Sequence, residues 1–171
     1  GDCTMSTLYV DTITEKTSGN GVVIPGHVIQ TVYNEFTDTT VSTTTFTYVD
    51  ATGSDLTIVT KQANSKIYLI AMCPLYLQNT CTGVAIGFKR GSTLIDGVNG
   101  GSGDAWQILN GTGLATASGV GLRQHLDAPA VAAGTSLTYK VQLGMWSTGQ
   151  VTVNFAGYGH KSKFLVQEIA Q

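Results

Sequence analysis

The sequence is poor in charge, and that scarcity excludes several classes of protein. Only 12% of its 171 residues are charged, against about 25% in an ordinary globular domain. With nine basic residues and a net charge of −2, the chain lacks the positive surface of a nucleic-acid-binding protein. Strong helix formers are few, which argues against an all-helical fold. No run of 18 apolar residues occurs, so no membrane span is predicted.

Cysteine and proline are scarce as well, at three residues each. The cysteines Cys3, Cys73 and Cys81 form no Cys-x-x-Cys pair and no spacing suited to zinc. Cys73 and Cys81 can close a hairpin as a disulfide, or they can remain reduced with one thiol packed in a core strand. Both interpretations stay open at the level of sequence.

The start of the chain has no pattern typical of a secreted protein. We interpret residues 1–4 as an expression remnant and Met5 as the native start. The residues after Met5 have neither a basic stretch nor an apolar one, so we expect synthesis in a cytoplasm. Residues 5–21 are polar and are interpreted as an extended lead-in, and residues 22–171 as one folded domain.

Threonine and glycine are abundant, and they point to β-structure. There are 25 threonines and 21 glycines, and the 42% of hydrophobic residues are scattered through the chain. Short segments rich in β-branched and aromatic residues alternate with turn signals, a pattern typical of a β-sandwich or barrel with about eight to ten strands. The expected strands lie at residues 22–24, 28–33, 41–49, 56–60, 66–73, 84–90, 136–144, 151–155 and 163–169.

The segment 66–73 is the strongest of these strands. It is apolar on both faces after Lys66, which predicts a central strand covered on both sides. Pro74 suggests a bulge or an edge at that point. We expect residues 84–90 to pair with this strand, and residues 147–149 to join strands 136–144 and 151–155 as a hairpin.

Five segments together resemble the jelly-roll domains of phage tail fibres and virion appendages, a pattern common in marine phages. They read as an N-terminal entry, PG-x-V-I-Q, x-S-K-I-L-(V/I), a paired strand motif, and a terminal strand ending in E-(I/L). These motifs match residues 5–13, 25–30, 64–71, 137–142 with 149–154, and 164–169. The resemblance implies an all-β jelly-roll sandwich, usually a homotrimer, located in a virion.

No catalytic constellation is recognisable, so we expect a binding protein that is not an enzyme and needs no cofactor. His27, His125 and His160 are far apart in sequence, and no hydrolase or phosphate-loop motif occurs. His125 and Asp127 can share a site, or a trimer axis can gather three copies of one histidine around a metal. The simpler interpretation is that each histidine lies at the surface and no metal binds.

Candidate receptor-binding residues are aromatic side chains in glycine-rich loops, because sugar rings stack on exposed aromatic faces. Trp146 is expected at the apex of the hairpin, and Tyr158 and His160 in a glycine-flanked loop. The alternatives are that Trp106 fills the core and that Tyr158 and His160 cover a trimer seam. The full candidate set is Trp106, Trp146, Tyr158, His160, Asp104 and Asn99.

Low charge also favours self-association, because charged groups are costly to bury. In a homotrimer, three lead-ins can wind together and bury Leu8, Val10 and Ile13. The resulting hypothesis is a virion protein that binds a host-cell glycan or protein receptor and other virion proteins. Two alternatives are a capsid or virion decoration protein with a purely structural role, and a non-viral C1q- or TNF-like or carbohydrate-binding module.

Overall fold

Twelve strands and no helix make up the described part of the chain. The computed structural model describes residues 12–14, 24–36, 39–43, 47–78, 83–97, 106–109, 116–145, 149–153 and 160–171. The strands are β1 (Val28–Phe36), β2 (Thr39–Thr43), β3 (Val49–Asp50), β4 (Leu56–Val59), β5 (Lys66–Gln78), β6 (Gly83–Arg90), β7 (Thr93–Asp96), β8 (Trp106–Leu109), β9 (Thr116–Asp127), β10 (Ser136–Met145), β11 (Gly149–Val153) and β12 (Ser162–Ile169).

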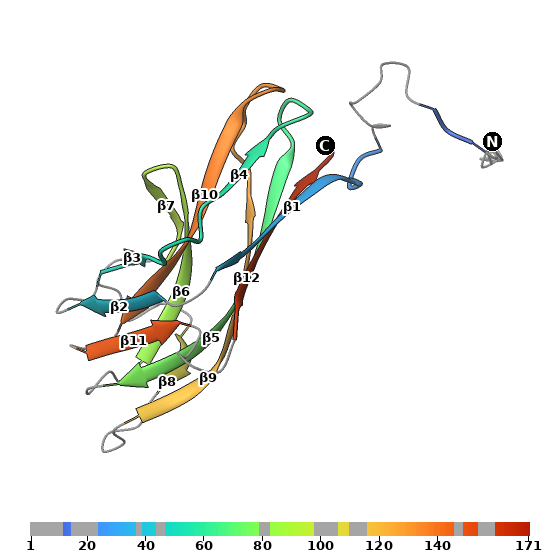
Figure 1. The fold of residues 1–171 in the computed structure, drawn as a ribbon. Helices are drawn as coiled ribbons and strands as arrows, with labels where there is room; N and C mark the ends of the chain where they lie inside the picture. Colours follow the sequence, from blue (N-terminus) through green and yellow to red (C-terminus); the bar gives the residue numbers. More distant parts are fainter. Residues whose placement is uncertain are drawn as a thin grey trace, which may run out of the picture.

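The strands form two antiparallel sheets that pack face to face (Figure 1). Sheet A has the order β1-β12-β5-β9, with β11 and β2 continuing from β5 beyond the end of β12. Sheet B has β3 and β4 on one side of β10, then β6, then β7 and β8. If β1 with β2, β3 with β4, β7 with β8, and β11 with β12 each count as one strand, these are the two interleaved four-stranded orders 1-8-3-6 and 2-7-4-5 of a jelly roll. The predicted fold class is confirmed.

The core between the sheets consists of the inward side chains of alternating positions. Phe88 of β6 stacks on Phe164 of β12 with ring centroids 5.7 Å apart. The predicted inward face of β10, including Tyr139 and Val141, is fully buried, as are Phe164 and Val166 on β12. Burying each large apolar side chain contributes about 1.5–3 kcal/mol, so this alternation positions both sheets.

Two predicted hairpins are wrong, because the chain crosses between sheets where the sequence suggested a local turn. Strand β6 pairs with β10, β7 and β8, whereas β5 belongs to the other sheet. Likewise β10 lies in sheet B while β11 pairs with β2 and β5 in sheet A. Successive strands of a jelly roll alternate between sheets, so neighbours in sequence need not be neighbours in a ladder.

Two further expectations about strands change. The predicted single strand 41–49 is replaced by β2 in sheet A and β3 in sheet B, with residues 44–46 outside the described part. Ile24 is not in a strand, and residues 22–23 lie outside the described part, but the predicted Pro25–Gly26 turn is present with Gly26 at φ +83°. A positive φ suits glycine, which has no Cβ.

Strand β5 runs through Pro74 without a bulge, so that alternative is wrong, but among the described residues Pro74 has a ladder partner on one side only, which is the local edge that the other alternative predicts. Pro74 pairs with Val120 of β9 on one side. On the other side, β12 pairs with β5 as far as Met72 and β11 begins to pair at Leu75. A proline removes one ladder donor, and here it stands where the partner strand changes and the ladder on that side is already interrupted.

Candidate functional site

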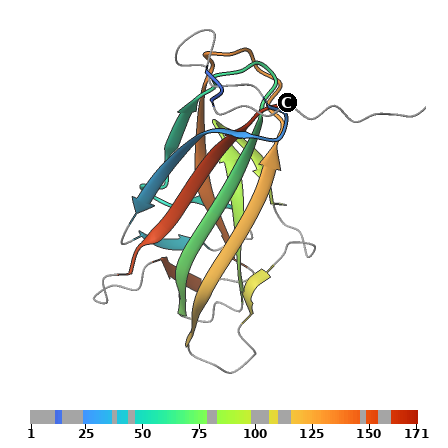
Figure 2. The same cartoon turned by 90° about the vertical axis from the view of Figure 1, so that its right-hand side faces the viewer.

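The outward face of sheet A is apolar at its centre. Along β5 the residues alternate between a fully buried inward row and a half-buried outward row. The outward row is Tyr68, Ile70, Met72, Pro74 and Tyr76. The prediction that β5 is central is confirmed, but within the described residues only its inward face is covered. Figure 2 shows sheet A in front, with no described segment lying across β1, β12, β5 and β9.

Neighbouring strands extend this apolar surface in register with β5. Strand β9 adds Val120, Leu122 and Leu126, which are 63%, 51% and 49% exposed. On the other side, Leu165 of β12 lies beside Ile70, and Tyr33 of β1 lies beside Leu165. Contiguous exposed apolar surfaces of this kind mark interaction sites in soluble proteins. We call the outward residues of these four strands the A face.

The A face is hollowed where β5 changes partner. A groove with a volume of about 290 Å³ is lined by residues 74–76, Ser118, Gly119, Val120 and His160. It adjoins a shallower depression that shares Pro74, Val120 and His160 and continues past Met72 to Glu35, Lys161 and Lys163. Because β12 pairs with β5 only as far as Met72 and β11 only from Leu75, no strand of the described part lies beside Pro74 on that side.

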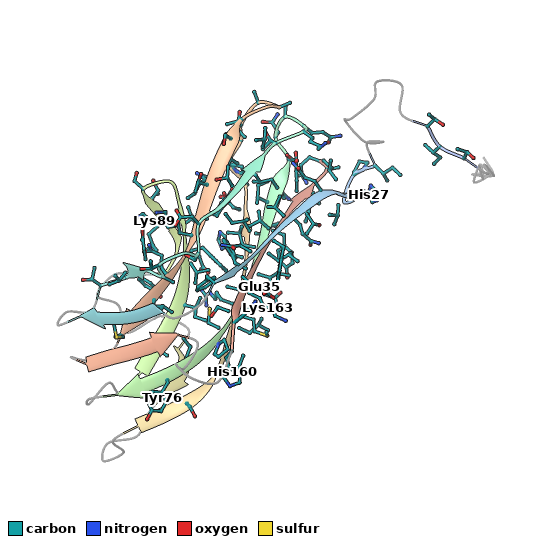
Figure 3. All side chains as sticks on the ribbon, in the orientation of Figure 1. His27, Glu35, Tyr76, Lys89, His160 and Lys163 are labelled. Atoms are coloured by element: carbon teal, nitrogen blue, oxygen red, sulfur yellow. The ribbon has the colours of Figure 1, made fainter. Side chains whose placement is uncertain are left out.

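The charged side chains that line the depression lie on one side of the groove and include the ion pair of Lys161 with Glu35, whereas Lys66 begins the outward row of β5 at its other end. Lys161 Nζ lies 3.0 Å from Glu35 Oε2, and the Tyr33 hydroxyl donates to Glu35 Oε1 at 2.6 Å. The hydrogen bonds from Tyr33 and Lys161 lower the pKa of Glu35, and the bond to Glu35 raises the pKa of Tyr33. In Figure 3, His160 lies between Tyr76 at one end of the sandwich and the neighbouring residues Glu35 and Lys163.

A buried carboxylate holds one end of the sandwich together. Glu168 of β12 is fully buried, and its oxygens accept hydrogen bonds from Ser65 Oγ at 2.7 Å and from Gln30 Nε2. The backbone N–H groups of Lys61 and Gln62 also donate to it, at 2.9–3.0 Å. Burial alone would raise the pKa of Glu168, but these donors outweigh it and the pKa is lowered. We call this set the Glu168 clasp.

The Glu168 clasp joins polar residues from three of the sequence motifs. Gln30 ends the PG-x-V-I-Q motif, Ser65 belongs to the x-S-K-I-L motif, and Glu168 belongs to the terminal motif. Three segments quoted for the family resemblance therefore meet at one buried hydrogen-bonded group. Their polar residues build the fold, and they are not themselves a surface site.

Two ion-pair groups tie β9 of sheet A to sheet B. Asp127 is bound in bidentate fashion by Arg90 at 2.6 and 2.8 Å and accepts the Tyr139 hydroxyl at 2.8 Å. Burial, followed by the bond to Asp127, raises the pKa of Tyr139 strongly. Arg123 binds Asp96 through two bonds of 2.6 Å. These contacts fix the edge strand that carries much of the A face.

The outward face of sheet B is different in kind. The ring of Tyr48 lies over the sheet, where it packs against glycines 87, 97 and 144. A Cβ at Gly87 would fall 2.8 Å from that ring and 2.4 Å from a backbone oxygen. Beyond the ring, Lys140 pairs with Asp50 at 3.4 Å and with Asp55 at 2.9 Å, and Lys89 pairs with Asp50 at 3.2 Å. We call this surface the B face.

Of the predicted receptor-binding residues, His160 is the one whose side chain is described, and it lines the groove of the A face. The backbone of Trp106 lies in β8 opposite Ala85, and its side chain is outside the described part. Because β10 and β11 form no hairpin, the expected hairpin apex at Trp146 is wrong. The remaining candidates lie outside the described residues: Asn99, Asp104, Trp146 and Tyr158.

The structure describes part of the predicted lead-in and the two other histidines. Ile13 is 58% exposed, whereas Leu8 and Val10 lie outside the described residues. His27 is exposed and its backbone bonds to Ala170. The suggestion that His125 shares a site with Asp127 is wrong, because the Nδ1 of His125 faces Asp96 at 3.8 Å while Asp127 binds Arg90.

Cys73 is a free thiol in the core, and Cys81 lies outside the described residues. Burial raises the pKa of Cys73 to about 11, although a hydrogen bond with Ser162 opposes this. A thiol with such a pKa is unreactive at neutral pH. Within the described ranges, no three metal-ligating side chains gather, and the same part of the chain has no helix able to cross a membrane.

Sequence reasoning missed the groove residues Pro74, Tyr76 and Val120 as candidates. The signal for them was present, because the segment 66–73 is apolar on both faces and a single core can cover only one of them. An apolar wall with an aromatic ring and an imidazole can receive the flat face of a sugar ring or an apolar side chain.

Comparison with known proteins finds similarity among solved structures. No family model matches the chain, and neither does any curated protein. Among solved structures, the chain is similar to one in the structure of the infectious bursal disease virus Gx strain, with a TM-score of 0.37 and 11% identity. The match covers 92% of this chain and 42% of that one, so the chain spans less than half the length of that protein.

Proposed function

We propose that this chain is a structural protein of a virion appendage such as a phage tail fibre, which assembles as a homotrimer and attaches the virion to a host-cell glycan or protein receptor. The observation that carries the proposal is the convergence of three motifs of the resemblance on the Glu168 clasp within a jelly roll. The ordered motifs are thus parts of one built feature and not scattered coincidences.

Attachment is assigned to the groove of the A face. It offers the apolar floor of Pro74 and Val120 together with Tyr76 and His160. These groups suit a sugar ring, which stacks on aromatic faces and accepts hydrogen bonds at its hydroxyl groups. The protein then acts by binding and not by catalysis.

A purely structural role, as a capsid or decoration protein, is the second candidate. The apolar A face favours it, because surface of this composition suits contact between proteins. Both candidates place the chain in a virion, and they differ in whether the groove meets a host molecule.

Labelled electron microscopy and a glycan array separate these candidates. We expect antibody label on tail fibres or appendages and binding to a defined set of host glycans, reduced about tenfold or more in Tyr76→Ala and His160→Ala. The matched control is Tyr33→Ala, a tyrosine on the same face that does not line the groove. Label on the capsid with no glycan bound favours decoration, and label on no virion overturns both.

A further inference from the structure

Strand β5 is apolar on both faces, and the described chain covers only one of them. The inward row of β5 is covered by sheet B, but the outward row is equally apolar and stays half-exposed. On sheet B the chain supplies its own cover through Tyr48 and pairs its own lysines with Asp50 and Asp55. Nothing comparable lies over sheet A among the described residues.

The size of the A face fits a stable protein interface. Four strands about 4.8 Å apart, each covering eight to thirteen residues at about 3.3 Å, span roughly 500–800 Å². A standard interface buries about 600–1,000 Å² on each partner. The area of the face therefore overlaps the range that stable interfaces between two chains occupy.

Charge on the A face identifies the kind of partner. Its centre carries no ionised side chain, and Tyr68 and Gln124 already satisfy each other by a hydrogen bond. At its charged side, Glu35 and Lys161 form a pair, with Lys163 next to Glu35 in the ladder. At the other end of the outward row, Lys66 begins β5. A surface that is neutral in the middle and carries its charges at the margins, with both signs at one side, meets another copy of itself with little desolvation cost.

We propose that the A face is the surface through which copies of this chain associate, centred on Ile70, Met72 and Leu122. Copies turned with this part of the face toward a shared axis bury Tyr68, Ile70 and Met72 of β5 and the exposed leucines of β9. The groove beside Pro74 and Tyr76 lies at the end of this area and stays open to a receptor. The inference rests on the self-association in the proposed function and deepens it by naming the surface. A closed symmetric assembly also prevents the face from recruiting chains without limit.

Two exposed aliphatic side chains provide a matched test. Leu122 lies on the A face, does not line the groove and is 51% exposed, whereas Val59 of β4 is 52% exposed and belongs to sheet B. The oligomeric mass of the full chain, Leu122→Lys and Val59→Lys is measured by sedimentation velocity from about 1 to 100 µM. Both sites are exposed, so both variants are expected to fold, which circular dichroism checks.

We expect the wild type and Val59→Lys to share one oligomeric mass and Leu122→Lys to dissociate at concentrations about 100-fold higher. If Leu122→Lys assembles as tightly as Val59→Lys, the A face is not the interface, even if the protein is a trimer. If the wild type is a dimer that Leu122→Lys dissociates, the interface is right and the proposed trimer is wrong. If the wild type is monomeric at every concentration, the inference is overturned, because copies of the chain do not cover this face.

Discussion

The two outward faces of the sandwich differ although the inward faces are built alike. Both sheets present alternating apolar side chains to the same core. Outside, the B face is completed within the chain by Tyr48 and by lysine–aspartate pairs, whereas the A face stays apolar from Tyr33 across to Leu122. With the A face as the proposed interface, the B face contributes to stability and the A face to association. Changes on the B face should alter unfolding, and changes on the A face should alter assembly.

The largest expected effect on stability comes from comparing two tyrosines, one on each face. Tyr48→Ala removes a ring that is 8% exposed, and we expect the unfolding free energy to fall by about 3 kcal/mol with no change in oligomeric mass. Tyr33→Ala on the A face, where the ring is half-exposed, is expected to cost less than about 1 kcal/mol. Urea denaturation at low protein concentration measures both. Equal losses would remove the distinction between the faces.

The Glu168 clasp lies on the inner side of sheet A. Its variants test whether a buried carboxylate contributes more to the unfolding free energy than an exposed one on the same sheet. Glu168→Gln leaves several buried donors facing a neutral amide, and we expect a loss of about 2 kcal/mol at pH 7. Glu35→Gln is the control, because Glu35 belongs to the same sheet but lies on the exposed A face. If Glu35→Gln lost as much unfolding free energy as Glu168→Gln, burial of the carboxylate would not explain the loss.

The stability difference between wild type and Glu168→Gln should also depend on pH. The folded-state pKa of Glu168 is lowered, so its contribution is fully present above the unfolded value of about 4.3. That contribution is lost as pH falls through the lowered folded value. Denaturation from pH 7 to pH 3 should therefore show the gap narrowing only on the acid side. A gap that widens toward acid would mean that burial outweighs the hydrogen bonds.

The smallest effect is expected from the charges of the B face. Asp50→Asn weakens pairs with Lys89 and Lys140 whose side chains are about a quarter exposed, while Asp50 itself is 38% exposed. Surface pairs of this kind contribute about 0–1 kcal/mol, so we expect a loss below about 1 kcal/mol and no change in mass. If the oligomer of this variant dissociates, the interface lies on sheet B and not on the A face.

The sequence predicted most of the strands but not their partners, and the expected strands did not include β7, β8 or β9. Alternation grouped Tyr139 with Val141 in β10, and Phe164 with Val166 in β12, and both groups are buried, because period-two patterning reflects one buried face. It could not show that β6 lies opposite β5 and not beside it, since turn residues look the same in a hairpin and in a crossing between sheets. The hairpin expected around Trp146 was wrong for that reason.

Non-local contacts explain the parts of the site that sequence reasoning missed. Glu168 resembles a polar residue at the end of a strand, yet its donors come from Gln30 and Ser65, more than 100 residues earlier. The groove depends on where β12 stops and β11 starts along β5, which no local pattern encodes. The two-sided apolarity of β5 was the correct signal, but the expected cover is absent from the described chain.

The most direct test of the account is the solution mass of the unmodified chain at micromolar concentration. Sedimentation equilibrium should give about three times the chain mass of 17.9 kDa, because burial of the A face requires further copies. A mass of 17.9 kDa up to about 100 µM would contradict it, since an apolar face of this size would then remain uncovered by copies of the chain.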